Sequence, residues 1–458
     1  MSSFARLWSD YTAIQAAKSL LGWDQQVLMP GGGASARSAH STRLAALAHQ
    51  ILASDEMGAA LERLGAEALP GTDAEAIVRV VTRARRTATA LGEQLVVRKA
   101  KASAEAYETW KVAKPGNDYA AMRPHYEEMF SIAREASAAL AAGDVKHPYD
   151  PLLDQYEEGA TTEQTRGLFD AMKSATKELL GAIAQATPVN DEVLARKFDG
   201  AKLLGFMRET VKQMGFDMGR GRLDICRNAF CTNLSMDDVR MTTRPSDHFK
   251  GIASSSLHEL GHAFYEQNQD PDLSLTPLRG GISLGVHESQ SRTWENIVGR
   301  SLGFWTYFLP SLQEVFPELI GLTPEEMWRM MNRVQATFVR VGSDELTYNA
   351  HIWTRLELEI DLLTESLSFA DLPEAWREKY REYLGIVPET DTDGCLQDVH
   401  WSRGSVGYFP TYSLGNLMSY QIWARMEQDL PDWEESFAMG DYGGVLGWLT
   451  DRIYRQGQ

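Results

Sequence analysis

Cysteine is scarce in this chain, which has three in 458 residues, at Cys226, Cys231 and Cys395. The odd number and the absence of a Cys-x-x-Cys pair argue against a disulfide framework and against a structural zinc site with cysteine ligands. The chain also lacks a run of about 18 apolar residues, the length typical of a transmembrane helix, and Met1 to Thr12 lack the apolar core of a secretory leader. We therefore expect a cytoplasmic protein with no membrane partner.

Positively charged residues are fewer than negatively charged ones. The chain has 45 Lys and Arg residues and 63 Asp and Glu residues, which gives a formal net charge of −18 at pH 7. Binding to phosphate groups requires a basic surface, so this balance argues against a nucleic-acid partner. Hydrophobic residues make up 43% of the chain, a share that is ordinary for a soluble globular protein.

Proline is sparse as well, with 17 residues, and alanine is abundant, so helix is the leading expectation for the fold. Residues 1–230 predict successive amphipathic helices, for example over residues 73–106 and 162–186. The glycine-rich segment 29–33 breaks the first helical run. These patterns predict an all-α protein.

The chain shows no sign of a linker between domains. Long Ser/Gly/Pro-rich stretches and internal repeats are both absent from the sequence. We therefore expect a single domain over residues 1–458. Its N-terminal part, residues 1–235, is expected to be helical, and its second part, residues 236–458, carries the motifs described next.

Residues 258–262, with the sequence HELGH, form an HExxH motif. On a helix, residues four apart share a face, so His258 and His262 can bind one metal ion at about 2.0–2.1 Å. Glu259, beside the first histidine, can accept a proton from the attacking water and pass it to the leaving amine. A chance match is expected in about one or two of a hundred chains with this many histidines, so the motif favours a zinc peptidase.

A catalytic zinc site requires a third protein ligand and one open position. Glu288 is the candidate, 26 residues after His262 on the next expected helix, and Arg292 one turn later can hold its carboxylate. The alternative is an exposed Glu–Arg pair. His287 competes for the same role, but adjacent helical residues point in different directions, so only one of the two can face the metal.

Three further segments give local predictions. Residues 238–242 alternate between polar and apolar side chains, which indicates a short half-buried strand. Thr323 and Glu326 form a capping-box pattern, and apolar residues follow at helical spacing to Phe338, so Arg340 is expected near the end of a long helix. Residues 394–415 are expected to be an aromatic-rich loop.

Five short motifs occur in order along the chain. They are DxRxT at Asp238, Arg240 and Thr242, HExxH at 258–262, HES[QG] at 287–290, IRxxAD at 339–344 and GxxQDxHW at 394–401. This set resembles the Taq-type metallocarboxypeptidases, also called thermostable carboxypeptidases, and the resemblance covers essentially the whole chain. Val339 and Ser343 depart from the family pattern, but they leave the arginine and aspartate of their motif in place.

This resemblance implies an all-α domain with a deep substrate groove, of which residues 1–235 form a wall, and a small strand element beside the HExxH helix. It also implies a homodimer that releases single residues from the C-termini of peptides with broad specificity. One Zn²⁺ per chain is implied, with Glu288 as its third ligand and Co²⁺ as a possible substitute.

A carboxypeptidase must recognise a free C-terminal carboxylate, and a guanidinium does this with two parallel hydrogen bonds. Arg340 is the candidate anchor. Its alternative role is an ion pair with Asp344 on a helix surface. Asp238 and Arg240 are placed on the substrate-binding side, where we expect them to fix the strand beside the cleft rather than to take part in the chemistry.

The reaction also needs donors for the negatively charged oxygen of the tetrahedral intermediate. His400, Tyr408 and Tyr412 are the candidates for this role or for holding the substrate backbone. Ordinary packing in the core is the alternative for each. Asp398 is expected to orient His400 or a metal ligand.

Two other classes of function remain open from the residues alone. A helical HExxH endopeptidase or oligopeptidase would share the metal site but would not need a carboxylate anchor. A catalytically inactive peptide-binding protein is the second alternative. The presence of Glu259 and of a complete ligand set argues against this second class.

Overall fold

Helices dominate the architecture, as the sparse proline and abundant alanine predict. The computed structural model describes residues 3–141, 143 and 145–458, and within them the chain forms 18 α-helices and one three-stranded sheet. None of the helices in these ranges has both the length and the apolar character needed to cross a membrane. The prediction of an all-α fold with a small strand element is confirmed.

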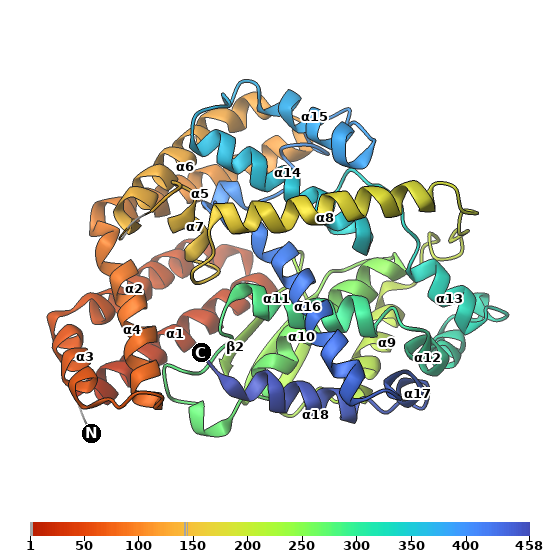
Figure 1. Ribbon diagram of the computed structural model, residues 1–458, viewed down its shortest axis with the longest axis horizontal. Helices are drawn as coiled ribbons and strands as arrows, with labels where there is room; N and C mark the ends of the chain where they lie inside the picture. Colours follow the sequence, from red (N-terminus) through yellow and green to blue (C-terminus); the bar gives the residue numbers. More distant parts are fainter. Residues whose placement is uncertain (1–2, 142, 144) are drawn as a thin grey trace.

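The first four helices pack around a small apolar cluster at one end of the molecule, drawn in red and orange in Figure 1. The glycine-rich segment does separate the first two helices, as predicted, and forms a short 3₁₀ turn at Gly31–Gly33. The helices are α1 (Ser3–Val27), α2 (Ala34–Ala53), α3 (Asp55–Glu67) and α4 (Asp73–Ala90).

A second cluster forms where helices from the N-terminal part meet two later ones. The single helix predicted over residues 73–106 is wrong, because α4 and α5 are separated at Leu91. Gly92 there has a φ of +61°, a left-handed conformation that glycine adopts without steric cost. The helices of this part are α5 (Gly92–Gly116), α6 (Tyr119–Leu140), α7 (Asp150–Asp154), α8 (Thr162–Ile183), α14 (Glu345–Leu363) and α15 (Leu372–Leu384).

The sheet consists of β1 (Gly221–Ile225), β2 (Cys231–Ser235) and β3 (Asp238–Thr243), in the order β1-β3-β2. The central strand β3 pairs in parallel with β1 and antiparallel with β2. Val239 and Met241 of β3 are fully buried and alternate with more exposed neighbours, which confirms the predicted strand. β3 packs against α10 (Phe249–Gln267), the helix predicted to carry the HExxH motif.

The largest cluster surrounds α10 and extends to the C-terminus. In Figure 1, α16 runs through the middle of the molecule beside α11, which in turn packs against α10. The remaining helices are α9 (Gly200–Gln213), α11 (Leu284–Arg292), α12 (Leu302–Val315), α13 (Pro324–Met331), α16 (Pro410–Asp429), α17 (Trp433–Ala438) and α18 (Gly443–Arg452).

Two glycines allow α11 to lie unusually close to its neighbours. A Cβ at Gly261 of α10 would stand 2.3 Å from the carbonyl oxygen of Gln290 and 2.5 Å from the Cα of Ser291. On the other side, a Cβ at Gly415 of α16 would stand 2.7 Å from the Cγ of Glu288. Since real Cβ contacts are longer than this, α11 is held between two backbones that have no side chain at the point of contact.

The helix that begins at Thr323 has the predicted capping box but ends earlier than predicted. It stops at Met331, where the Asn332 side chain donates to the carbonyls of Trp328 (2.8 Å) and Arg300 (2.9 Å). Arg340 therefore lies in a 3₁₀ turn, not near the end of a long helix. Apolar spacing alone did not reveal this end, because it depends on a contact with a distant carbonyl.

The predicted aromatic loop over residues 394–415 is only partly correct. α16 begins at Pro410, so Tyr412 lies on a helix, whereas His400 and Tyr408 lie in the connection that precedes it. A proline in the first turn suits a helix start, since its φ is already helical and its missing N–H has no partner there.

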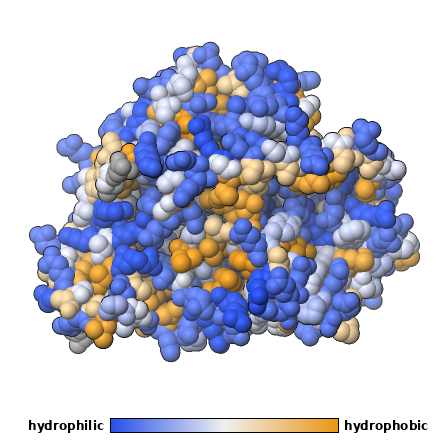
Figure 2. Space-filling view, in the orientation of Figure 1, coloured by the Kyte–Doolittle hydropathy of each residue, from blue (hydrophilic) through white to orange (hydrophobic). Residues whose placement is uncertain are grey.

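One face of the molecule is not uniformly polar. Figure 2 shows apolar colour along the part of this face occupied by α8 and α16. The exposed apolar side chains of these two helices include Leu168, Leu179 and Tyr420. Surfaces of this kind often contact another protein surface.

We predict that Gly261→Ala lowers the free energy of unfolding by about 1–3 kcal/mol, because the new methyl group forces α10 and α11 apart. Urea unfolding measures this change. The matched control is Gly205→Ala on α9, where no atom lies within 4 Å of the new Cβ. The control is expected to raise stability by roughly 0.5–1 kcal/mol, since alanine favours helix. Equal stability of the two variants would contradict the close packing.

Candidate metal centre and substrate cleft

The structure brings His258, His262 and Glu288 together, with ligand atoms that all lie within 4.8 Å of one another. The Oε2 atom of Glu288 is 3.7 Å from Nε2 of His258 and 3.6 Å from Nε2 of His262. Two imidazole nitrogens and one carboxylate oxygen suit a divalent transition metal with an open fourth position. The residues present therefore fit the metal that the HExxH motif predicts.

The second nitrogen of each histidine ligand has its own partner, which turns both Nε2 atoms toward the shared site. Nδ1 of His258 donates to Glu295 at 2.9 Å, and Nδ1 of His262 shares a hydrogen bond with Nδ1 of His287 at 2.7 Å. Partners of this kind fix the orientation of metal-binding histidines. Sequence reasoning missed Glu295, although it lies on the turn directly after α11 and within one turn of Arg292.

The competition between Glu288 and His287 has a geometric answer. Both ring nitrogens of His287 are engaged, one with His262 and the other with Glu266 at 2.9 Å. Oε1 of Glu288 accepts from Nε of Arg292 at 2.8 Å, as the sequence predicted, which leaves Oε2 facing the histidines. His287 thus contacts the candidate ligand His262 and lies outside the group of His258, His262 and Glu288.

The surroundings of Glu288 and His262 favour the protonation states that metal binding requires. Burial disfavours the charged form of His258, but the carboxylates of Glu288 and Glu295 outweigh it and raise the pKa of this imidazole, so a metal must displace its proton. Burial opposes ionisation of Glu288, but the positive charges of His258 and Arg292 outweigh it and hold the pKa of this carboxyl well below its usual value. Burial lowers the pKa of His262 to about 4. An ionised carboxylate and a neutral imidazole are the forms that bind metals.

Glu259 lies beside the ligand group but is not part of it. Its side chain is buried, and burial together with the negative charges of Glu288 and Glu295 raises its pKa to about 7. His258 and Arg244 oppose this rise. A carboxyl group with a pKa near the working pH is suited to accept and return a proton.

A cleft of about 650 Å³ opens beside the N-terminal half of α10. Of the residues before 236, only Asp191 and Ala229 line it in the described part of the chain. A second cleft, of about 630 Å³, lies between the N-terminal helices and α11, and His287 lines it. The expected role of residues 1–235 as a groove wall stays a prediction. The candidates that line the first cleft are His258, Glu259, Arg340 and Tyr412.

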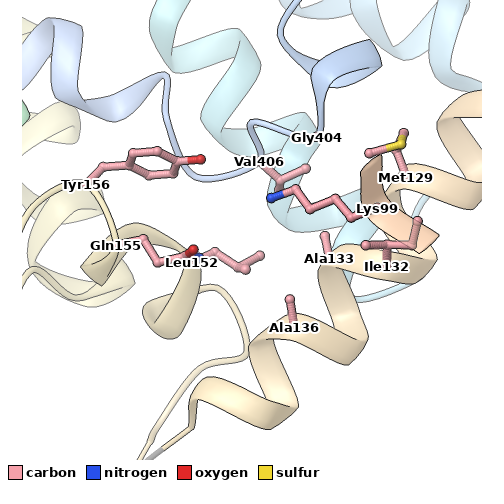
Figure 3. Close-up of a pocket in the computed structure, with 10 residues that line it drawn as sticks. All are labelled: Lys99, Met129, Ile132, Ala133, Ala136, Leu152, Gln155, Tyr156, Gly404 and Val406. Atoms are coloured by element: carbon pink, nitrogen blue, oxygen red, sulfur yellow. The ribbon is translucent and has the colours of Figure 1, made fainter. Parts of the chain in front are cut away.

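A third cavity is too small to hold a peptide. It measures about 10 Å³ and lies between α6 and the loop at Gly404 and Val406 (Figure 3). The Lys99 amine enters a lining that is largely apolar, and burial lowers its pKa. A volume of this size holds about one water molecule. The cleft beside Glu259 is the candidate for substrate, because His258 and Glu259 line it and do not line the second cleft.

Arg340 is buried at the edge of this larger cleft. Its Nε and Nη2 donate to Oδ1 of Asp398 at 3.2 and 2.9 Å, and its Nη1 donates to the Tyr348 hydroxyl at 2.7 Å. The alternative pairing with Asp344 is wrong, since Asp344 caps α14 by accepting from backbone amides. Three of the five N–H groups of this guanidinium are in use, which leaves two for a ligand.

The expectation that Asp398 orients His400 is not supported by the distances. Asp398 binds Arg340 and Arg355, and its nearest oxygen is 3.8 Å from Nδ1 of His400, too far for a hydrogen bond. Despite burial, these two arginines hold the pKa of Asp398 well below its usual value. Asp398 therefore fixes the arginines, a role that the sequence motif did not reveal.

Of the three candidate oxyanion donors, Tyr412 is the one that lines the cleft within the described residues. Its hydroxyl is 3.3 Å from Nε2 of His400, and its ring meets that of Tyr408 edge-on with centroids 5.3 Å apart. His400 and Tyr408 thus pack behind Tyr412. The structure supports part of the alternative, that some of these residues are packing residues.

Asp238 and Arg240 pair with each other through two hydrogen bonds of 2.7 Å. The Arg240 guanidinium also lies over the Trp23 ring of α1, at 4.4 Å from the ring centroid. Neither residue is among those that line the cleft within the described residues. They tie the sheet to α1, and their place among the substrate-binding residues stays a prediction.

Known proteins resemble this chain along its whole length. The family model described as carboxypeptidase Taq (M32) metallopeptidase matches residues 3–458. Thermostable carboxypeptidase 1 of Thermus thermophilus is 40% identical over 451 residues, which cover 96% of this chain and 88% of that protein. Thermostable carboxypeptidase 1 of Pyrococcus furiosus is 36% identical over 466 residues, which cover 100% of this chain and 91% of that protein.

Solved structures show the same relationship. The structure of Pyrococcus furiosus carboxypeptidase has a TM-score of 0.95 at 35% identity and covers 100% of this chain and 93% of that one. The M32 carboxypeptidase of Deinococcus radiodurans R1 has a TM-score of 0.94 at 36% identity, with coverage of 99% and 92%. The fold is therefore shared from end to end.

We predict that Glu288→Ala removes the bound metal, because the two histidines alone leave the site with too few ligands. His287→Ala is expected to weaken metal binding by only about 10- to 100-fold, since it removes a support of His262 rather than a ligand. Titration with a competing chelator measures both affinities. A larger loss for His287→Ala than for Glu288→Ala would refute the assignment of the third ligand.

Proposed function

The chain belongs to the carboxypeptidase Taq (M32) family of metallopeptidases and is a metal-dependent carboxypeptidase, and we propose that Zn²⁺ is its metal. The observation that carries this proposal is the group of His258, His262 and Glu288 beside a cleft that Glu259 lines. Two imidazoles and one carboxylate are a frequent ligand set of catalytic zinc, and Co²⁺ can substitute in such sites. When bound, the metal polarises the scissile carbonyl and acidifies the attacking water.

Glu259 is proposed as the general base. It lies next to His258 on α10, lines the cleft, and has a pKa that burial raises to about 7. Its carboxylate takes the proton of the attacking water and then delivers it to the amine of the departing amino acid. Tyr412, which lines the same cleft, is proposed to donate its O–H to the oxyanion, with His400 behind it at 3.3 Å.

Arg340 is proposed to bind the C-terminal carboxylate of the peptide. It lines the cleft, and its position is fixed by Asp398 and Tyr348. A chain with a net charge of −18 has no general positive field that attracts an anion. The cation that binds the carboxylate must therefore lie at the binding site itself. Removal of one residue at a time follows from such an anchor, because the scissile bond then lies at a fixed distance from it.

Location and assembly are further proposals. All three cysteines are unpaired, which supports a reducing compartment such as the cytoplasm. The apolar side chains exposed on α8 and α16 support the homodimer that the family resemblance implies. Light scattering after gel filtration tests the dimer, and a monomer at micromolar concentration would reject it.

The function is tested by mass spectrometry of peptides digested with the purified protein. We expect ladders that shorten from the C-terminus, that stop when a chelator is added, and that return when Zn²⁺ or Co²⁺ is restored. Peptides with an amidated C-terminus are the control and should resist cleavage. Internal fragments that appear equally from amidated peptides would instead favour the endopeptidase alternative.

Glu259→Gln is expected to keep the metal but to lower kcat by about 10²- to 10⁴-fold, the usual contribution of a general base. The substitution keeps the shape of the side chain and removes its ability to accept the proton. Metal content and turnover are measured on the same sample. Activity within about tenfold of the wild type would reject the role.

Arg340→Ala is expected to lower kcat/KM for free-acid peptides by roughly 30- to 5,000-fold, as the loss of a buried charge contact of about 2–5 kcal/mol implies. Metal content should not change. Arg403→Ala is the control, because Arg403 lies over the Tyr107 ring and does not line the cleft within the described residues. If kcat/KM fell by the same factor for free-acid and amidated peptides, Arg340 would not be the residue that binds the carboxylate.

A further inference from the structure

A second arginine enters the substrate cleft from a different part of the fold. Arg244 directly follows β3 and lines the cleft together with His258 and Glu259. Arg340 reaches the same cleft from the turn that precedes α14. The two guanidinium groups therefore belong to separate elements, and the motif that contains Arg340 does not include Arg244.

The arginines that line the cleft differ in whether their charge is paired. Within the described residues, each of the other four has a carboxylate within 4.0 Å, whereas Arg244 has none. Its Nε is also buried and lacks a hydrogen-bond partner in the protein. The four pairs are Arg292 with Glu288, Arg300 with Glu295, Arg333 with Asp191 and Arg340 with Asp398.

A buried N–H without an acceptor is unfavourable, so such a donor in a cleft is suited to a ligand that supplies the acceptor. An anion suits it best, because the unpaired group is a permanent cation. Arg244 is also half-buried, where a charge-assisted hydrogen bond is stronger than at an exposed surface. A carboxylate is the anion that every peptide substrate brings with its C-terminus.

Arg340 alone is an incomplete anchor for that carboxylate. Asp398 occupies its Nε and Nη2, so it approaches a ligand with two N–H groups. The lining carboxylates Asp191 and Glu295 are themselves paired with arginines. A second cation without a carboxylate partner adds to what Arg340 offers an anion.

Arg244 lines the cleft beside Glu259, and its positive charge acts on this carboxyl, whose pKa is raised first of all by burial. Arg340 lines the same cleft. Both arginines therefore border the space in which the C-terminus of the peptide is proposed to lie.

We propose that Arg244 binds the C-terminal carboxylate of the peptide together with Arg340, as the unpaired cation of a two-arginine site. This inference rests on the proposed carboxypeptidase reaction. Arg340 is held in one orientation by Asp398 and Tyr348, and Arg244 supplies a cation that has no carboxylate partner of its own. The competing role for Arg244 is to moderate the charge of Glu259 without touching the substrate.

The test compares a short peptide ending in a free acid with the same peptide ending in an amide. Arg244→Met removes the charge and keeps a side chain of similar length. Arg244→Lys keeps the charge but loses the planar guanidinium that can donate two parallel hydrogen bonds. Arg227→Met is the matched control, because it removes one positive charge from an exposed residue between β1 and β2 that does not line the cleft within the described residues. Metal content and thermal unfolding are measured for each variant to verify that it folds.

Arg244→Met is expected to lower kcat/KM for the free acid by roughly 10- to 100-fold, chiefly by raising KM, as the loss of a charge-assisted contact implies. Arg244→Lys should recover part of this loss. The amide should change by no more than about threefold for either variant, and Arg227→Met should leave both peptides unaffected. Free leucine as a competitive inhibitor should weaken in parallel with the free-acid peptide, whereas leucinamide should not.

Two results would overturn the inference while leaving the proposed function intact. If kcat/KM fell equally for the acid and the amide, Arg244 would act on the charge of Glu259 and would not bind the substrate carboxylate. No loss for either peptide would remove it from the site. A wild-type protein that does not prefer the free acid, in contrast, would reject the carboxypeptidase reaction together with its two-arginine site.

Discussion

The contact between the backbone of α11 and Gly261 of α10 is the constraint on which the rest of the site depends. It lets the third candidate ligand, Glu288, approach the helix face that carries the two histidines. Gly415 of α16 permits an equally close approach from the other side. Side chains at either position would push α11 outward, and a ligand displaced by even 1 Å no longer matches the geometry that a metal ion requires.

Buried charges then orient what the helices bring together. Glu295, His287 and Arg292 each hold one of the three candidate ligands by an atom that the metal does not use. Burying so many charges is unfavourable unless each one is paired. In this site the pairing leaves two imidazole nitrogens and one carboxylate oxygen free on one side, which is the arrangement that accepts a divalent cation. The same principle singles out Arg244, whose charge the protein leaves unpaired.

The parts of this site that the sequence could predict are those set by local spacing. The HExxH geometry, the placement of Glu288 on the next helix and its contact with Arg292 all follow from helical periodicity. The surroundings of Arg340 could not be predicted, because its partner Asp398 lies 58 residues further along the chain. The early end of α13 and the pairing of Glu295 with His258 also depend on tertiary contacts. Periodicity carries no information about which distant segments meet.

The central claim is that one metal ion is held by His258, His262 and Glu288 and by no other protein side chain. Anomalous diffraction from crystals of the metal-loaded protein, recorded on both sides of the zinc absorption edge, tests this claim most directly. The account predicts one strong peak per chain, at about 2.0–2.2 Å from Nε2 of both histidines and from a carboxylate oxygen of Glu288. A peak bound by His287, or one located away from α10, would contradict it.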